Sequence, residues 1–268
     1  MPTLPTPGVG IVTEMIRPIY PEQGDPISDL VGSLLDDDRR PHEDGGARPW
    51  VLVNMVNSVD GATAVEGGAT GLTDEDDQAL FHAFRGVCDL ILVGASTVRA
   101  EDYGPVRVNE DVAAARQRSG RSVTPRLAVI SRSLDLDPEA RLFSDPKQMP
   151  VLVTCASAPS EQVALLRSLT EVIVAGEDTV DLTVALPLLG ERGHAVVLCE
   201  GGPTLNGHLV AGDLIDEINL STSPKVVAGQ SARIVRSPLP LENPFSFRLD
   251  RLLLGDRTLF ARWLRHRA

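Results

Sequence analysis

One short segment constrains the fold more than any other part of the chain. Residues 195–199 (AVVLC) form an apolar run typical of a strand buried in a parallel sheet. Glu200 follows the run, at the strand end where open α/β sheets bind ligands. Gly201 and Gly202 have no Cβ, so a ligand can approach their backbone, and Pro203 suits the first position of a helix. Because helix N-termini attract phosphates, the pattern predicts either a diphosphate site beside one carboxylate or an ordinary glycine turn.

Composition excludes several classes of function. The 268 residues are enough for one large domain or two small ones. A net charge of −12 argues against a nucleic-acid partner, which would require basic patches. No apolar run is long enough to span a membrane, and residues 1–10 lack the pattern of a signal peptide. The three scattered cysteines are typical of reduced core thiols in a cytoplasmic protein, and no spacing predicts a metal site.

Two regions differ in composition. Residues 1–48 are rich in Pro, Gly and Asp and predict an N-terminal arm that is partly disordered or draped on the domain, with one short helix over residues 27–35. Residues 49–268 predict a single α/β domain in which strands alternate with helices. The expected strands are residues 50–56, 90–93, 126–130, 151–154, 171–174, 195–199 and 217–221, and the expected helices begin at residues 73, 160, 182 and 203. Residues 248–254 and 258–264 predict a terminal hairpin, so the sheet is expected to be mixed and mostly parallel, with helices on both faces.

Four segments in order carry a family resemblance. They are NMVNSVDG (residues 54–61), GASTVRAED (94–102), EGGPTL (200–205), and DEI (216–218) followed by SPK (223–225). Together they resemble the pyrimidine reductase of bacterial riboflavin biosynthesis, the reductase domain of a bifunctional deaminase/reductase. The resemblance implies a three-layer fold like that of dihydrofolate reductase and covers residue 50 to the C-terminus. Fewer than 50 residues precede the match and the zinc ligands are missing, so the deaminase domain is not expected in this chain.

The resemblance also implies a reaction, namely that of a 5-amino-6-(5-phosphoribosylamino)uracil reductase-like enzyme. Hydride would pass from NADPH to the ribose imine of a ribosylamino-pyrimidine phosphate, in a cytoplasmic homodimer. An imine accepts hydride better when it is protonated, so a nearby carboxylate is useful. Glu200 and Asp60 are the carboxylates on matched motifs and are the catalytic candidates. The alternative for Glu200 is a strand-end acid that caps backbone, and for Asp60 an ordinary Asp-Gly turn.

Further site residues are carried over by the resemblance. Those expected to hold NADPH are Val56, Thr97, Glu101, Ser131, Arg132, Gly201, Gly202, Pro203 and Thr204. Arg132 suits the 2′-phosphate because a guanidinium matches a phosphate, although a solvated turn arginine explains it equally well. Those expected to hold substrate are Asn54, Arg85, Arg107 and Glu200. Arg85 also suits the end of a helix through its charge.

Three positions depart from the family pattern. Ala69 replaces a serine, Gly71 a bulkier residue, and Tyr103 a proline. Tyr103 adds an aromatic face that can stack on a flat heterocycle. These changes leave two alternatives open: a pterin or dihydrofolate-type reductase of the same fold, and a non-catalytic NADPH-binding protein.

Overall fold

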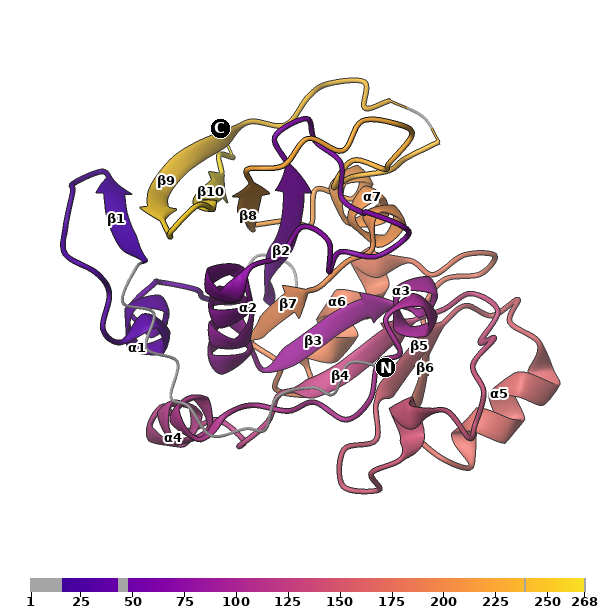
Figure 1. Cartoon of the computed structure of the whole chain (residues 1–268). Helices are drawn as coiled ribbons and strands as arrows, with labels where there is room; N and C mark the ends of the chain where they lie inside the picture. The colour runs from indigo at the N-terminus through magenta and orange to yellow at the C-terminus, as the bar shows by residue number, and fades with distance from the viewer. Residues whose placement is uncertain (1–15, 43–47, 239, 268) are drawn as a thin grey trace.

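A single sheet of ten strands runs through the computed structural model, which describes residues 16–42, 48–238 and 240–267 (Figure 1). The strands are β1 (Arg17–Tyr20), β2 (Trp50–Ser58), β3 (Leu90–Gly94), β4 (Arg126–Ile130), β5 (Val151–Thr154), β6 (Val172–Val174), β7 (Val196–Cys199), β8 (Glu217–Ser223), β9 (Phe247–Leu254) and β10 (Leu259–Arg265). The helices are α1 (Leu30–Leu35), α2 (Glu75–Val87), α3 (Ala95–Ala100), α4 (Glu110–Arg118), α5 (Ser160–Arg167), α6 (Leu182–Gly190) and α7 (Pro203–Ala211), with a 3₁₀ turn at Arg141–Phe143.

The strand order is β1-β9-β10-β8-β2-β7-β3-β4-β5-β6. Strands from β8 to β6 in this order are parallel to their neighbours, whereas β10, β9 and β1 join antiparallel at one side. This arrangement confirms the expected mixed, mostly parallel sheet with a C-terminal hairpin. It also brings the carboxyl ends of β2, β7 and β3 to one edge of the sheet, because these three strands are adjacent and parallel.

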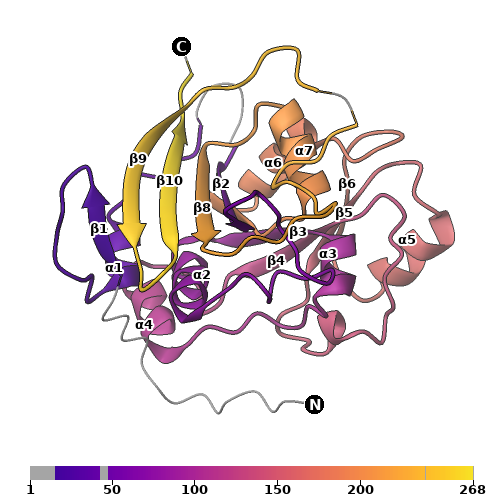
Figure 2. The ribbon, with the colours of Figure 1, turned by 45° about the horizontal axis from the view of Figure 1, so that its top comes forward.

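Helices cover both faces of the sheet (Figures 1 and 2). One core lies under α1, α2, α4 and α5 and includes Phe84 and Leu166. The other lies under α6 and α7 and includes Leu186 and Leu209. Each of these four side chains has at most 1 % of its surface exposed, so burial of apolar surface holds the three layers together.

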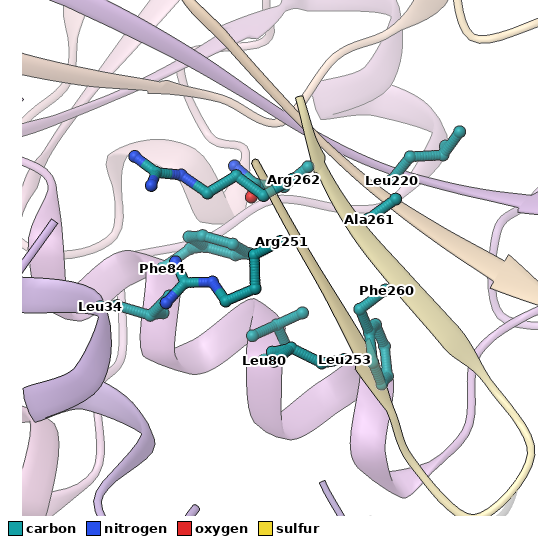
Figure 3. Close-up of a pocket in the computed structure, with 10 residues that line it drawn as sticks. Leu34, Leu80, Phe84, Leu220, Arg251, Leu253, Phe260, Ala261 and Arg262 are labelled. Carbon is teal, nitrogen blue, oxygen red and sulfur yellow. The ribbon is translucent and has the colours of Figure 1, made fainter. Parts of the chain in front are cut away.

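Helix α2 was expected from residue 73, with Thr73 as its cap, but it begins at Glu75. Its cap is Asp74, whose carboxylate accepts the N–H of Asp77 at 2.8 Å. Leu80 and Phe84 of α2 pack against Leu253 and Phe260 of the hairpin (Figure 3). The space left among these side chains is about 10 Å³, so this contact is closed to any ligand.

The described part of the N-terminal arm is ordered against the domain. Strand β1 pairs with β9, and α1 lies within the stretch where a short helix was expected. Ile16 is fully buried and its carbonyl accepts the N–H of Ile27 at 2.8 Å. Residues 1–15 and 43–47, which the sequence assigns to the same arm, lie outside the described residues.

Candidate active site

A cavity of about 740 Å³ lies at the carboxyl ends of β3 and β7. Its walls come from the middle of β2, from one side of α2, from the start of α3, and from the loops around residues 63–73 and 101–107. The size is that of a pocket for a small molecule or cofactor, and the position is where parallel sheets bind ligands. Across the described residues, no helix is long and apolar enough to cross a membrane, and no cluster of His, Cys, Asp or Glu could hold a metal ion.

Glu200 is fixed beside this cavity by three hydrogen bonds to its carboxylate. Arg85 of α2 donates from Nε to Oε1 at 2.8 Å and from Nη2 to Oε2 at 2.9 Å. Tyr103 donates its hydroxyl to Oε2 at 2.7 Å. Only 1 % of the Glu200 side chain is exposed, so the carboxylate is held almost without water and keeps one open lone pair on Oε1.

This cluster changes the pKa of both donors. Burial disfavours the charged Arg85 guanidinium, but the Glu200 carboxylate outweighs burial and raises the pKa of Arg85 above its ordinary value. Burial raises the pKa of Tyr103 well above its ordinary value, and the adjacent Glu200 raises it further. Tyr103 therefore keeps its proton at neutral pH. Its hydroxyl is committed to Glu200, a contact that the sequence-based stacking interpretation did not foresee.

The glycine turn after Glu200 forms a narrow cradle. Gly201 has φ of 92°, and a Cβ there would lie 3.1 Å from the sulfur of Met55. A Cβ on Gly202 would lie 2.7 Å from Oγ1 of Thr97. Neither α3 nor α7, whose first turns adjoin this point, has a side-chain cap, so backbone N–H groups at both helix starts are available. A side chain at either glycine would collide with Met55 or Thr97, so the turn can stay this close to both helix starts only with glycine, and the N–H groups there suit an anion such as a diphosphate.

The structure brings only part of the expected cofactor set to the cavity. Val56, Thr97, Glu101, Gly202 and Pro203 line it. Gly201 and Thr204 flank these residues in the chain without lining the cavity.

Ser131 and Arg132 lie apart from the cavity, after β4. Ser131 is buried and its hydroxyl accepts the N–H of Leu134 at 2.9 Å, which is a local turn role. Arg132 is exposed. Their contact with the adenosine side of a cofactor remains a proposal.

Asp60 does not line the cavity. Its carboxylate accepts the hydroxyl of Ser58 at 2.5 Å and the N–H groups of Val227 and Ala228 at 3.1 and 2.7 Å. These bonds, the Ser58 bond first, lower the pKa of Asp60 to about 2. The geometry corresponds to the structural alternative for the Asp-Gly turn, because the carboxylate holds a loop far along the chain and has no proton to transfer at neutral pH.

The expected substrate residues all line the cavity: Asn54, Arg85, Arg107 and Glu200. Arg107 is exposed and available to an anion. Arg85 donates from Nε and Nη2 to Glu200, and its guanidinium lies 4.4 Å from the centre of the Phe81 ring. The donors of Arg85 that remain for a substrate phosphate are therefore those of Nη1 and the second N–H of Nη2.

Sequence reasoning missed a second titratable group in the cavity wall. Asp77 is 6 % exposed, and burial raises its pKa to about 6 although the Ser221 hydroxyl opposes the shift. Asp77, Phe81 and Arg85 all line the cavity at intervals of four residues, which places them on one side of α2. That spacing was visible in the sequence, but a first-turn aspartate also suits the helix dipole and did not stand out.

Comparison with known proteins gives a consistent result. The family model described as the RibD C-terminal domain matches residues 49–258. A protein of Methanothermobacter thermautotrophicus named 2,5-diamino-6-ribosylamino-4(3H)-pyrimidinone 5′-phosphate reductase is 33 % identical over 186 residues, which are 69 % of this chain and 82 % of the relative. A protein of the same name from Archaeoglobus fulgidus is 30 % identical, over 70 % of this chain and 86 % of the relative. The crystal structure of a pyrimidine reductase-like protein from Corynebacterium diphtheriae is similar with a TM-score of 0.76 and 26 % identity, over 82 % of this chain and 93 % of that one.

Proposed function

The chain belongs to the RibD C-terminal domain family, and on that premise we propose that it reduces a ribosylamino-pyrimidine phosphate with NADPH. It is an oxidoreductase of the riboflavin-biosynthesis type, as its named relatives are. One observation carries the proposal. A buried carboxylate, held by an arginine and a tyrosine, adjoins a glycine cradle at the mouth of one large cavity.

The cradle would hold the cofactor. Its diphosphate would lie on Gly202 and the uncapped start of α7, beside Thr97, with Glu101 in the same cavity wall. NADPH, when bound, supplies the hydride. The two glycines let the turn lie close to the starts of α3 and α7, so that backbone N–H groups of both helices can face the diphosphate.

The Glu200 cluster would act on the substrate. Reduction of the ribose imine is fastest when its nitrogen carries a proton, so the reacting C=N group is positively charged until the hydride adds to its carbon. The free lone pair on Oε1 of Glu200 suits that N–H, and the Arg85 and Tyr103 donors hold the carboxylate in position before the substrate arrives. Arg107 would take the phosphate, with Arg85 Nη1 as a second donor.

We also propose that the enzyme is a homodimer in the cytoplasm. The resemblance to the family supports a homodimer. The three cysteines are free and buried, which suits a cytoplasmic enzyme. Sedimentation at several protein concentrations tests the homodimer, and a monomer at all of them would overturn it.

A spectrophotometric panel tests the reaction. NADPH oxidation is followed with the ribosylamino-pyrimidine phosphate, with dihydrofolate and with a simple pterin. We expect turnover with the first compound alone. Turnover only with dihydrofolate or the pterin would make this chain a pterin-type reductase, and NADPH binding without any turnover would make it a non-catalytic nucleotide-binding protein.

Substitution Glu200→Gln tests the carboxylate. The amide keeps the shape but loses the charge that faces the protonated imine, so we expect kcat to fall about a hundredfold or more while the Kd for NADPH changes by less than about threefold. Stopped-flow turnover and calorimetric titration of NADPH give the two numbers. Equal losses in turnover and in NADPH affinity would remove Glu200 from the substrate side.

A further inference from the structure

Three aspartates stand at the start of α2, and they do not share a role. Asp74 caps the helix, and its other oxygen accepts the hydroxyl of Thr258. Asp76 accepts the N–H of Asp256 at 2.7 Å. These two tie α2 to the turn between β9 and β10. Asp77 instead lines the cavity.

Asp77 is a buried hydrogen-bond acceptor with spare capacity. The Ser221 hydroxyl lies against it, and no arginine or lysine in residues 16–42, 48–238 and 240–267 forms an ion pair with it. Its raised pKa, about 6, agrees with burial that no cation offsets, and leaves the group mostly ionised at pH 7. A buried carboxylate costs free energy unless donors reach it, so a ligand with N–H groups suits this wall. Asn54 lies on the same cavity, and its Oδ1 has no partner among the described residues.

The position of Asp77 relative to the reacting end is set by the helix. Arg85, which holds Glu200, follows Asp77 by eight residues, or about 12 Å along α2. In the substrate class proposed above, the reacting ribose carbon and the N3/C2 edge of the pyrimidine lie on opposite sides of the ring. A substrate with its ribose at Glu200 and its ring lying along the α2 wall of the cavity would present the N3/C2 edge to Asp77.

We propose that Asp77 reads this edge, so that the enzyme reduces the 2-amino-4-oxo pyrimidine in preference to its 2-oxo (uracil) counterpart. The inference rests on the proposed function and names the substrate of that same site. In the 2-amino compound, the 2-amino group and N3–H form a parallel pair of donors that matches the two oxygens of one carboxylate. In the uracil, a carbonyl oxygen replaces the amino group and faces a carboxylate oxygen, so two acceptors repel and one stays unpaired.

Substitution Asp77→Asn replaces one of the two acceptor oxygens of the carboxylate with an NH₂ donor. The amide offers one acceptor and one donor, which matches N3–H and the 2-carbonyl of the uracil. Glu75→Gln is the matched control: Glu75 lies in the same turn and loses the same charge, but it is exposed and does not line the cavity. Circular dichroism and thermal melting check that each variant folds.

The experiment measures kcat/KM for both ribosylamino phosphates with wild type, Asp77→Asn and Glu75→Gln. We expect wild type to favour the 2-amino compound by at least about a hundredfold, since a buried polar group left unpaired discriminates strongly. We expect Asp77→Asn to reduce that ratio at least tenfold by gaining on the uracil, and Glu75→Gln to keep it. Equal use of both compounds by wild type, or an equal loss for both in Asp77→Asn, would overturn the inference, because a structural role lowers both alike.

A binding measurement separates this inference from the proposed function. Calorimetric titration with 2,6-diaminopyrimidin-4-one and with 6-aminouracil needs no turnover. Tighter binding of the diamino ring to wild type, lost in Asp77→Asn, supports the role of Asp77 even if neither phosphate is reduced, in which case the reductase proposal fails alone. No difference between the two rings in wild type would overturn the role of Asp77.

Discussion

At the residue scale, Tyr103 is the position where the candidate site differs most from the family pattern. Its hydroxyl adds a third donor to the Glu200 carboxylate, at a position where the family pattern has a proline. We expect Tyr103→Phe to lower kcat about tenfold, because a hydrogen bond to a charged group contributes about 1.5–3 kcal/mol and Arg85 still holds the carboxylate. NADPH affinity should stay as in wild type. Steady-state kinetics test this, with Tyr20→Phe as control, since Tyr20 is exposed and lies on β1. Unchanged kcat in Tyr103→Phe would show that Arg85 alone positions Glu200.

Asp77 should cost stability at neutral pH. Its pKa rises from an ordinary 3.8 to about 6 in the fold, so the stability linked to its protonation is fully present below pH 3.8 and is lost as pH rises through 6. One pKa unit corresponds to about 1.4 kcal/mol, so Asp77→Asn should raise the free energy of unfolding by about 2–3 kcal/mol at pH 7 and by about half of that at pH 5. Urea denaturation at the two pH values measures both gains. A gain of the same size at both would show that ionisation of Asp77 is not the cause.

At the scale of elements, the glycine turn between β7 and α7 is the part of the fold on which NADPH binding is proposed to depend. Gly202 has an extended backbone that any residue can adopt, so its importance lies in space rather than in conformation. Gly202→Val would place a side chain between Thr97 and the start of α7, and we expect NADPH binding to fall below detection by calorimetry while the circular dichroism spectrum is retained. The same substitution in a Thr97→Ala background removes the contact at 2.7 Å and isolates blockage of the cradle from distortion of the turn. Wild-type affinity in either background would discard the cradle.

How much the sequence predicts also depends on the kind of element. Strands such as β3, β5 and β7 are continuous apolar runs, and α2 and α7 carry end signals, so all five were expected close to their observed positions. Three elements were missed. Helix α3 has six residues, too few to show a period, α4 is mostly polar, and β1 exists because β9 lies beside it.

In the candidate site, too, local motifs were predicted and contacts between distant segments were not. Glu200, Arg85 and the glycines were predicted one by one from motifs. Their bonding was not, since Arg85 and Glu200 are 115 positions apart and only the fold joins them. The bond from Tyr103 to Glu200 was missed for the same reason, since 97 positions separate the two residues, whereas Asp77 was missed because a first-turn aspartate also suits the helix dipole.

At the scale of the whole molecule, a buried ion cluster ties the N-terminal arm to the sheet. Glu217 of β8 is fully buried and accepts Arg39 of the arm at 2.8 Å and Arg262 of β10 at 3.0 Å. Burial alone would raise the pKa of Glu217, but these two arginines hold it far below its ordinary value of 4.5. The stability from this cluster is therefore present above pH 4.5 and is lost as pH falls toward the depressed pKa.

Removal of one arginine from this cluster should destabilise the fold. We expect Arg39→Met to lower the free energy of unfolding by about 3–5 kcal/mol at pH 7, because Glu217 stays buried and charged with only one of its two arginine partners. The neighbouring Arg40→Met is the matched control: its ion pair with Asp38 is exposed, and we expect a change below about 1 kcal/mol. Chemical denaturation of the two variants measures the difference. Equal effects would show that the arm contributes little to the stability of the domain.

Strand β1 has a further consequence for how copies of the chain can meet. It occupies the hydrogen-bonding margin of β9, so a second molecule cannot lengthen the sheet there by adding its own strand. The new outer margin is four residues long and includes Pro18, which has no N–H to offer. At this border, copies of the chain can associate only through side chains, and the sheet is protected there from edge-to-edge strand pairing.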